Sequence, residues 1–420
     1  MKAHGQHETQ DRRSGLPSRP RAGGGARPGV GGGAPSVYFD NAATSNPKPP
    51  QVLEAMEHYM KKVCASPGRG GYRWSLDAGR IVYQARAKVR ELFNAPALES
   101  VAFTMNVTYA LNCAIQGLVR PGDHVVTTSV EHNSVIRPLR FMQEAYGIQV
   151  TVVQCDGRGM LDPDDVRRAM RPETRTVVMT HASNVVGSVL PVAEVGRVAQ
   201  EFGAFFIVDT AQTAGVLDID FAAIGADVLA FTGHKSLMGP PGTGGFVVSS
   251  RAAGEMRPLV HGGTGSRSHL ETQPEDLPDK FESGTMNTVG IAGLAAGIEF
   301  VLSTGLERIC EHERSLARRF VDGVREIGGF KLYGPEAPGQ RVATVSVGSE
   351  RGADLANLAY RLDAEYGVMV RSGLHCSPLA HRTIGTFPEG TLRFSFGYFN
   401  TEDEVDYAVR ALAALATTDM

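Results

Sequence analysis

AFFIVDTAQ (204–212) and ADVLAFTGHK (226–235) are the two stretches that decide the fold. Each is a short apolar run of the kind that forms a buried strand, and each ends in polar residues. Similar runs recur along the chain and alternate with amphipathic segments, which is the pattern of a mainly parallel sheet covered by helices. The other strand runs are VAFT (101–104), HVVTTS (124–129), QVTVVQC (149–155), TRTVVMTHAS (174–183) and GGFVVSS (244–250).

Helices are expected between these strands, because apolar residues recur there at three- and four-residue spacing, most clearly in 75–93, 164–170 and 192–202. Past residue 303 the pattern changes to a long helix at 306–327, then short strands in RVATVSV and TLRFSFG with a helix at 355–365 between them. We therefore expect an α/β protein with a large, mainly parallel sheet domain over 37–303 and a smaller α+β C-terminal domain over 304–420. The first residues of the large domain could pack on the small one.

Composition limits the remaining possibilities. The chain has 420 residues and a net charge of −3, and it lacks an apolar run of the ~18 residues that a membrane span needs, so we expect neither nucleic-acid nor membrane binding. Its five cysteines are scattered without a CxxC pair, which predicts no disulfide framework, no metal site and a cytoplasmic location. Cys113 falls on an apolar helix face and is expected to be buried and inert. Residues 1–36 are rich in Gly, Pro and Arg, and we expect a disordered tail there rather than a transit peptide.

Asp209 and Lys235 are the residue pair that carries most chemical information. A lysine can hold a carbonyl cofactor as a Schiff base, and a carboxylate on the nitrogen of a pyridine ring turns that ring into an electron sink. Taken singly, Asp209 would rather be a helix cap and Lys235 a surface lysine, but Lys235 stands in a glycine-rich turn suited to hold backbone near a ligand. Ligands bind beyond the carboxyl ends of parallel strands, so we expect other polar residues at strand ends to share the site: Thr104, Glu131, His132 and Asn184.

FTMNVTYALN (103–112) offers a phosphate site. The helix predicted after this strand would present free backbone N–H groups from Asn106, Val107 and Thr108, together with the Thr108 hydroxyl. An ordinary helix N-cap is the alternative interpretation. In SVEHN (129–133), His132 could stack on a flat ring and transfer protons near neutral pH, or be a packed histidine.

Three further candidates lie in the C-terminal part. Arg371 and Arg393 follow or end strands, where a planar guanidinium suits a substrate carboxylate or a structural salt bridge. Cys376 lies in RSGLHCSPLAH (371–381), close to Arg371, His375 and His381. Because nearby cations favour the nucleophilic thiolate, Cys376 is the candidate nucleophile.

In these motifs the chain resembles the cysteine desulfurases of the class V aminotransferase family, from about residue 37 to residue 415. Those enzymes use pyridoxal 5′-phosphate (PLP) to convert cysteine to alanine and a protein-bound persulfide. The resemblance implies the fold type I of PLP-dependent transferases and a closed two-fold homodimer. The matching motifs occur in the family's order: YFDNAATSNPKP (38–49), NVTYALN (106–112), EHN, SNVVGS (183–188), VDTAQ, FTGHK, FESGTMNT (281–288), RSGLHC and LRFSFG.

The resemblance also implies a role for each matching residue, and no metal. Lys235 would hold the cofactor, Asp209 its ring nitrogen, and Thr285 the phosphate of the neighbouring subunit. Asn106 and Val107 stand where many members have Gly and Thr, so one side-chain hydroxyl is missing. The implied cofactor ligands are Val107, Thr108, His132, Asn184, Asp209, Gln212, Thr232, His234, Lys235 and Thr285. The implied substrate ligands are Asn184, Arg371 and Arg393. The implied catalytic residues are Lys235, His132 and Cys376.

The short GLHC segment is similar to the branch of the family that carries its nucleophile on a compact loop. That branch includes selenocysteine lyases and usually works with a sulfur-accepting protein or thiol, as in iron–sulfur cluster biogenesis. The leading prediction is desulfuration of L-cysteine, in which Cys376 takes the sulfur. Selenocysteine cleavage, epimerisation and transamination on the same scaffold are alternatives. A non-catalytic sulfur-transfer scaffold is a further one, although intact Lys235, Asp209 and Cys376 speak against it.

Overall fold

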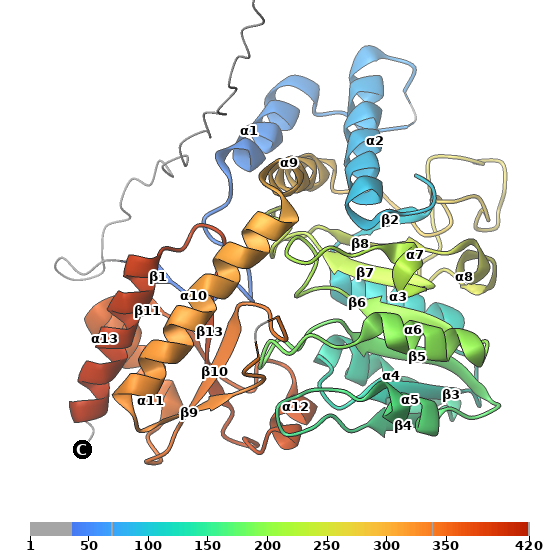
Figure 1. The fold of residues 1–420 in the computed structure, drawn as a ribbon. Coiled ribbons are helices and arrows are strands. Elements are labelled where there is room, and N and C mark those ends of the chain that lie inside the picture. The colour runs from blue at the N-terminus through green and yellow to red at the C-terminus, as the bar shows by residue number, and fades with distance from the viewer. Residues whose placement is uncertain (1–35, 69, 338, 419–420) are drawn as a thin grey trace, which may run out of the picture.

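The computed structural model describes residues 36–418 except 69 and 338, and Figure 1 shows its architecture. The expected tail, residues 1–36, lies outside this range apart from Ser36. The helices are α1 (Pro50–His58), the π-helical turn η1 (Tyr59–Val63), α2 (Arg73–Phe93), α3 (Val107–Leu118), α4 (Asn133–Tyr146), α5 (Pro163–Ala169), α6 (Val192–Glu201), α7 (Phe221–Ile224), α8 (Ser250–Glu255), α9 (Thr288–Thr304), α10 (Leu306–Ile327), α11 (Leu355–Tyr366), α12 (Pro378–Thr383) and α13 (Glu402–Thr418). The strands are β1 (Val37–Tyr38), β2 (Val101–Thr104), β3 (His124–Thr128), β4 (Gln149–Val153), β5 (Thr174–Thr180), β6 (Phe205–Asp209), β7 (Val228–Thr232), β8 (Gly244–Val248), β9 (Phe330–Tyr333), β10 (Thr344–Ser349), β11 (Val368–Met369), β12 (Arg371–Gly373) and β13 (Thr391–Ser395).

A seven-stranded sheet in the order β2-β8-β7-β6-β5-β3-β4 forms the centre of the larger part. Strands β3 to β7 run parallel, and β8 runs antiparallel to both of its neighbours. Every residue of β3, β6, β7 and β8 is buried, because helices cover both faces of the sheet (Figure 1). One face packs on α2, α6 and α9 and the other on α3 and α4, so the strands read as continuous apolar runs.

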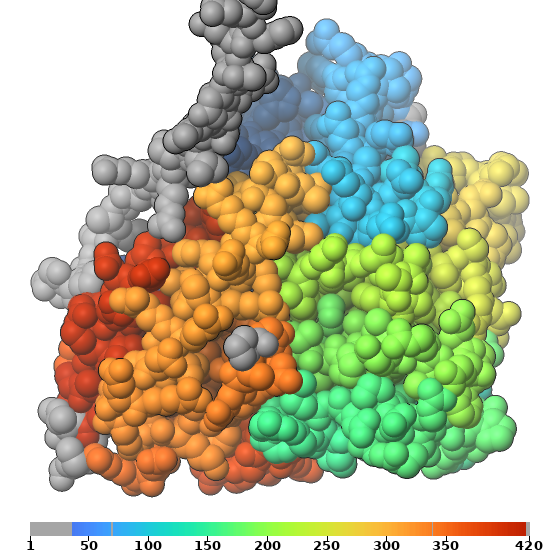
Figure 2. Space-filling view, in the orientation of Figure 1, coloured from blue at the N-terminus to red at the C-terminus, as the bar shows by residue number. Residues whose placement is uncertain are grey.

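A second, antiparallel sheet in the order β12-β13-β10-β9 has its own core with α10, α11 and α13. The first described strand, β1, pairs in parallel with β11, and Phe39 packs into this C-terminal core. Gly305 separates α9 from α10. Figure 2 shows the C-terminal part, coloured orange to red, as a mass beside the green body of the central sheet.

The elements expected from periodicity are present. The helices predicted at 75–93, 164–170, 192–202, 306–327 and 355–365 correspond to α2, α5, α6, α10 and α11 within two residues at each end. All five cysteines are free. Within the described residues, no single helix is long and apolar enough to cross a membrane; α9 and α10 meet that test only as a pair bent by 84°. The same residues contain no group of His, Cys, Asp and Glu side chains that could hold a metal ion.

Candidate active site

A cavity of about 300 Å³ opens where β6 and β7 end, at the carboxyl edge of the parallel strands. Its walls bring together most of the predicted site residues: Val107, Thr108, His132, Asn184, Asp209, Gln212, Thr232, His234, Lys235, Arg371 and Arg393. The convergence has a simple cause, because parallel strands place their carboxyl ends at one edge of the sheet.

Two residues expected at this edge do not line the cavity, and that part of the prediction is wrong. The Thr104 hydroxyl turns back and donates to the carbonyl of Asn106 at 2.8 Å. Glu131 is fully buried and accepts hydrogen bonds from the Thr128 hydroxyl at 2.5 Å and the Thr180 N–H at 3.0 Å. Burial raises the pKa of Glu131 to about 8, so its carboxyl is a neutral part of the core at pH 7.

Asp209 and Lys235 both line the cavity, and the charge of each shifts the pKa of the other. Asp209 is 3% exposed, and one carboxylate oxygen accepts from the Ala211 N–H at 2.9 Å. Burial raises the pKa of Asp209, and the Lys235 charge opposes that rise. Burial lowers the pKa of Lys235 to about 8, while Asp209 acts in the opposite direction. An amine that loses its proton this readily is a suitable nucleophile toward a carbonyl cofactor.

His132 is the N-cap of α4, and its hydrogen bonds define its protonation. Its Nδ1 accepts from the Ser134 N–H at 3.0 Å and lies 2.8 Å from the Ser134 hydroxyl. Burial, followed by the Lys235 charge, lowers the pKa of His132 to about 4. The ring is therefore neutral at pH 7 with its proton on Nε2, which suits stacking on a flat ring more than it suits proton donation.

The start of α3 provides the donors for a phosphate. The Asn106 side chain caps the helix by accepting from the Tyr109 N–H at 2.9 Å, so the N-cap interpretation holds as well. The N–H groups of Val107 and Thr108 are left without a partner among the described residues. The Thr232 hydroxyl is buried and likewise unpartnered within that range. Free donors at a helix N-terminus beside a lysine fit a phosphate group.

Arg393 forms the structural salt bridge that was one of the two purposes considered for it. It is 1% exposed and forms an ion pair in which Nη2 lies 2.6 Å from Oδ1 of Asp40. Its Nη1 donates to the carbonyl of Asn184 at 3.0 Å, while its Nε has no partner among the described residues. The guanidinium is thus held by the protein, and Arg393 lines the cavity while one of its N–H groups has no partner within the described residues.

Cys376 is exposed and does not itself line the cavity, but it directly follows His375, which does. Its Sγ lies 3.9 Å from Nη2 of Arg371, which donates a weak hydrogen bond to the sulfur. The expectation that His375 and His381 are also cations here is wrong: both rings are buried, and burial lowers their pKa values to about 2 and about 4. Arg371 therefore provides the positive charge beside the thiol.

Three hydrogen bonds attach the loop at 374–377, called the cysteine loop from here on, to the larger part of the molecule. The Asn184 amide donates to the His375 carbonyl at 2.7 Å and accepts from the Ser377 hydroxyl at 2.7 Å. The Asn133 N–H donates to the Cys376 carbonyl at 2.8 Å. His375 and Cys376 both have left-handed backbones, with φ of 49° and 60°. Asn184 thus lines the cavity with an amide already engaged in positioning the cysteine loop.

Other residues of the site escaped the sequence interpretation. Asp40 and Lys48 both lie in the YFDNAATSNPKP motif, which identified the segment without assigning these side chains a task. Lys48 donates to the His234 carbonyl at 2.6 Å, and burial lowers its pKa to about 8. Ser134 links the His132 ring to the Thr108 hydroxyl, 2.7 Å away; the EHNS sequence offered a helix start there but no partner for the ring.

Thr285 is the one predicted cofactor ligand that lies elsewhere. It does not line the Lys235 cavity of its own chain, and it is exposed. It borders a larger cavity of about 580 Å³ between α2 and the segments 66–68, 263–266 and 278–286.

Comparison with known proteins identifies the class. The family model described as aminotransferase class-V matches residues 37–408, and the chain belongs to that family. Its fold is the fold type I of PLP-dependent transferases, which confirms both the predicted α/β class and the fold that the resemblance implied.

Relatives and solved structures similar to this chain carry the name cysteine desulfurase. A probable cysteine desulfurase of Methanothermobacter thermautotrophicus is 37% identical over 384 residues, which covers 90% of this chain and 94% of the relative. A probable cysteine desulfurase of Pyrococcus abyssi is 35% identical, with 90% and 94% covered. Among solved structures, the apo cysteine desulfurase of Thermococcus onnurineus NA1 superposes with a TM-score of 0.86 at 33% identity, covering 91% of this chain and 95% of that one. The cysteine desulfurase CsdA of Escherichia coli gives 0.82 at 27% identity, again with 91% and 95% covered.

Proposed function

We propose that this chain is a PLP-dependent cysteine desulfurase, which converts L-cysteine to L-alanine and retains the sulfur as a persulfide on Cys376. The observation that carries the proposal is the contact of an exposed thiol with Arg371, which lines the same cavity as Asp209 and Lys235. Relatives and structural neighbours named cysteine desulfurase support it. Transamination and epimerisation require no cysteine at that position.

The residues of the cavity fit the cofactor. Lys235 would hold PLP, Asp209 would bind its ring nitrogen, and the neutral His132 ring would stack on it. The unpartnered donors of Val107, Thr108 and Thr232 would bind the phosphate. PLP, when bound, supplies the electron sink for the α-carbon of the substrate.

The chain's own groups account for binding, proton transfer and sulfur transfer. Arg393, with its free Nε, and Arg371 bind the substrate carboxylate. Lys235, with its pKa near 8, can take and return a proton close to neutral pH. The Cys376 thiolate forms an S–S bond to the substrate sulfur as the Cβ–S bond breaks. The carbon skeleton keeps the electron pair of the broken bond, takes up a proton and leaves as alanine.

The assembly proposed for this activity is a closed two-fold homodimer in which Thr285 of each chain serves the neighbour's phosphate. Its exposure, and its absence from the Lys235 cavity of its own chain, support this. We further propose a division into a PLP-binding domain over 37–303 and a small domain over 304–420 that carries Cys376. The exposed thiol suits transfer of sulfur to an acceptor protein or thiol.

Replacement of Cys376 tests the function. Cys376→Ser should keep the colour of the bound cofactor, because Cys376 makes no contact needed for cofactor binding, and alanine release from cysteine should fall by orders of magnitude. The matched control is Cys64→Ser, since Cys64 is the other exposed cysteine among the described residues and does not line the cavity. Alanine release near the wild-type rate from Cys376→Ser would contradict the desulfurase mechanism. Turnover of selenocysteine alone by that variant would move the assignment to a selenocysteine lyase.

A further inference from the structure

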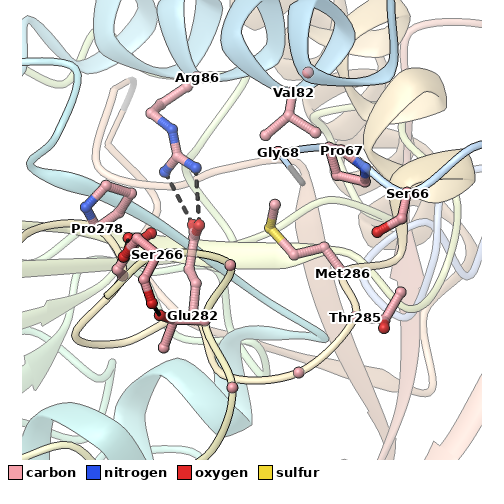
Figure 3. A pocket seen from close by; sticks show the side chains of 16 residues that line it. Ser66, Pro67, Gly68, Val82, Arg86, Ser266, Pro278, Glu282, Thr285 and Met286 are labelled. Atoms are coloured by element: carbon pink, nitrogen blue, oxygen red, sulfur yellow. Dashed lines mark hydrogen bonds and ion pairs between the residues drawn. The ribbon is translucent and has the colours of Figure 1, made fainter. Parts of the chain in front are cut away.

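A buried ion pair between Arg86 and Glu282 lies beside the larger cavity, away from Lys235 (Figure 3). Each guanidinium Nη donates to a different carboxylate oxygen at 2.9 Å. The two side chains are 9% and 5% exposed. Removing two charges from water offsets much of the attraction between them, so the pair calls for an explanation other than stability alone.

The pair joins three elements. Arg86, on α2, also donates to the carbonyl of Val101, and Oε1 of Glu282 accepts from the N–H of Phe103 at 2.7 Å. Both backbone groups belong to β2, the outer strand of the central sheet, whose open edge would otherwise leave them unpaired. The Arg86 guanidinium lies 4.9 Å from the centre of the Phe103 ring. Glu282 is therefore fixed to the edge of the sheet both directly, through Phe103, and through Arg86 of α2.

Glu282 begins the short loop that carries Thr285, and Asn287 ends it. The Asn287 side chain caps α9 by accepting from the Gly290 N–H at 3.1 Å, and it donates to the Gly242 carbonyl at 2.9 Å. Between these two anchors Thr285 is exposed, and its hydroxyl has no hydrogen bond within the described part of the chain. Figure 3 shows Thr285 and Met286 on this loop, beyond the Arg86–Glu282 pair.

We propose that Arg86 and Glu282 are positioning residues, which hold the 282–287 loop so that the Thr285 hydroxyl reaches the cofactor phosphate of a second copy of this chain. This inference rests on the proposed function, because it requires a cofactor on Lys235 and a two-fold dimer. An anchored loop presents its hydroxyl without a further ordering cost when the phosphate binds. The pair therefore acts on the neighbour's site and not on that of its own chain.

The first test is the rate at which purified dimer releases PLP into a scavenging apoenzyme, without substrate. Glu282→Gln removes the charge and leaves Arg86 buried and unpaired, which could unfold the chain. The double variant Arg86→Met with Glu282→Gln avoids that charge and still lets an amide oxygen accept from Phe103. PLP release from either variant should be roughly tenfold faster than from the wild type. That factor is the effect of weakening one hydrogen bond to a charged group, here the bond from Thr285 to the phosphate. The control is Glu299→Gln. Glu299 forms an ion pair with Lys88, which lies on α2 like Arg86, but the Glu299 side chain is 58% exposed.

Mixed dimers then identify which subunit the pair serves. In a dimer of one Glu282→Gln chain and one Lys235→Ala chain, the remaining Lys235 faces an intact loop, and PLP should leave at the wild-type rate. In a dimer of one wild-type chain and one chain that carries both Glu282→Gln and Lys235→Ala, the remaining Lys235 faces the altered loop, and PLP release should be fast. The opposite pattern would overturn the inference. So would a wild-type rate of PLP release from both the Glu282→Gln homodimer and the homodimer of the double variant Arg86→Met with Glu282→Gln. A Lys235→Ala homodimer that keeps the wild-type colour would instead overturn the proposed function itself.

Discussion

The pKa of Lys235 leads to a prediction about how the protein acquires its cofactor. Only the neutral amine can attack a carbonyl. At pH 7 an amine with a pKa of about 8 is about 10% neutral, whereas one at the ordinary value of about 10.5 is about 0.03% neutral. Burial of Lys235 should therefore raise the rate of covalent PLP attachment at pH 7 by a factor of about 300 through the neutral fraction alone.

The measurement follows the visible absorption after cofactor-free protein is mixed with PLP between pH 6 and pH 10. An acetylated lysine amide, measured in parallel, corrects for protons gained or lost by PLP itself. The corrected rate should level off above a pH of about 8. In Asp209→Asn the levelling should move to lower pH, because the Asp209 charge opposes the effect of burial on the pKa of Lys235.

Lys48 provides the matched control, since burial lowers its pKa to about 8 as well. Lys235→Ala should abolish the attachment, and Lys48→Met should retain the same pH profile. A corrected rate that still rises tenfold per pH unit up to about pH 10 would refute the argument, because Lys235 would then have an ordinary pKa.

Two further outcomes are expected. Asp40→Asn should lower the thermal midpoint by several degrees, because it leaves the buried Arg393 without its carboxylate partner. The same variant should raise the KM for cysteine about tenfold with a smaller change in kcat. An unchanged KM would show that Asp40 does not orient Arg393 for substrate. Deletion of residues 1–36 should leave activity and the thermal midpoint nearly unchanged, because this segment has little apolar surface to bury; a large loss of either, measured on the purified truncated protein, would mean that the segment docks.

Local pattern was sufficient for most of the fold and for the centre of the site. Strand runs and helix periodicity predicted the large parallel sheet, and Asp209 and Lys235 converge because parallel strands end at one edge. The pattern failed where a side chain turns away from that edge. Thr104 and Glu131 also stand at or just after strand ends, but their oxygen atoms are taken up by neighbouring backbone and hydroxyl groups.

Contacts between distant segments were beyond the reach of periodicity. Asp40 and Arg393 are 353 residues apart, and Arg86 and Glu282 are 196 apart, so neither ion pair leaves a local signal. The error over the two histidines near Cys376 has the same origin. Their position in the sequence suggested cations beside the thiol, whereas the fold buries both rings and makes neutral imidazole the favoured form.

The proposed sulfur transfer places two conflicting requirements on the loop that carries Cys376. In the proposed mechanism Cys376 would have to reach a substrate inside the cavity, and its sulfur would later have to be accessible to an acceptor outside. Two consecutive left-handed residues, His375 and Cys376, and three hydrogen bonds to Asn184 and Asn133 hold this backbone next to the cavity that His375 lines, at a conformational cost of about 1–3 kcal/mol for each strained residue. With the backbone held in this way, we expect rotation about the Cα–Cβ bond to be the main motion of the thiol. Because the thiol is already exposed, we expect an acceptor to reach it without opening of the loop.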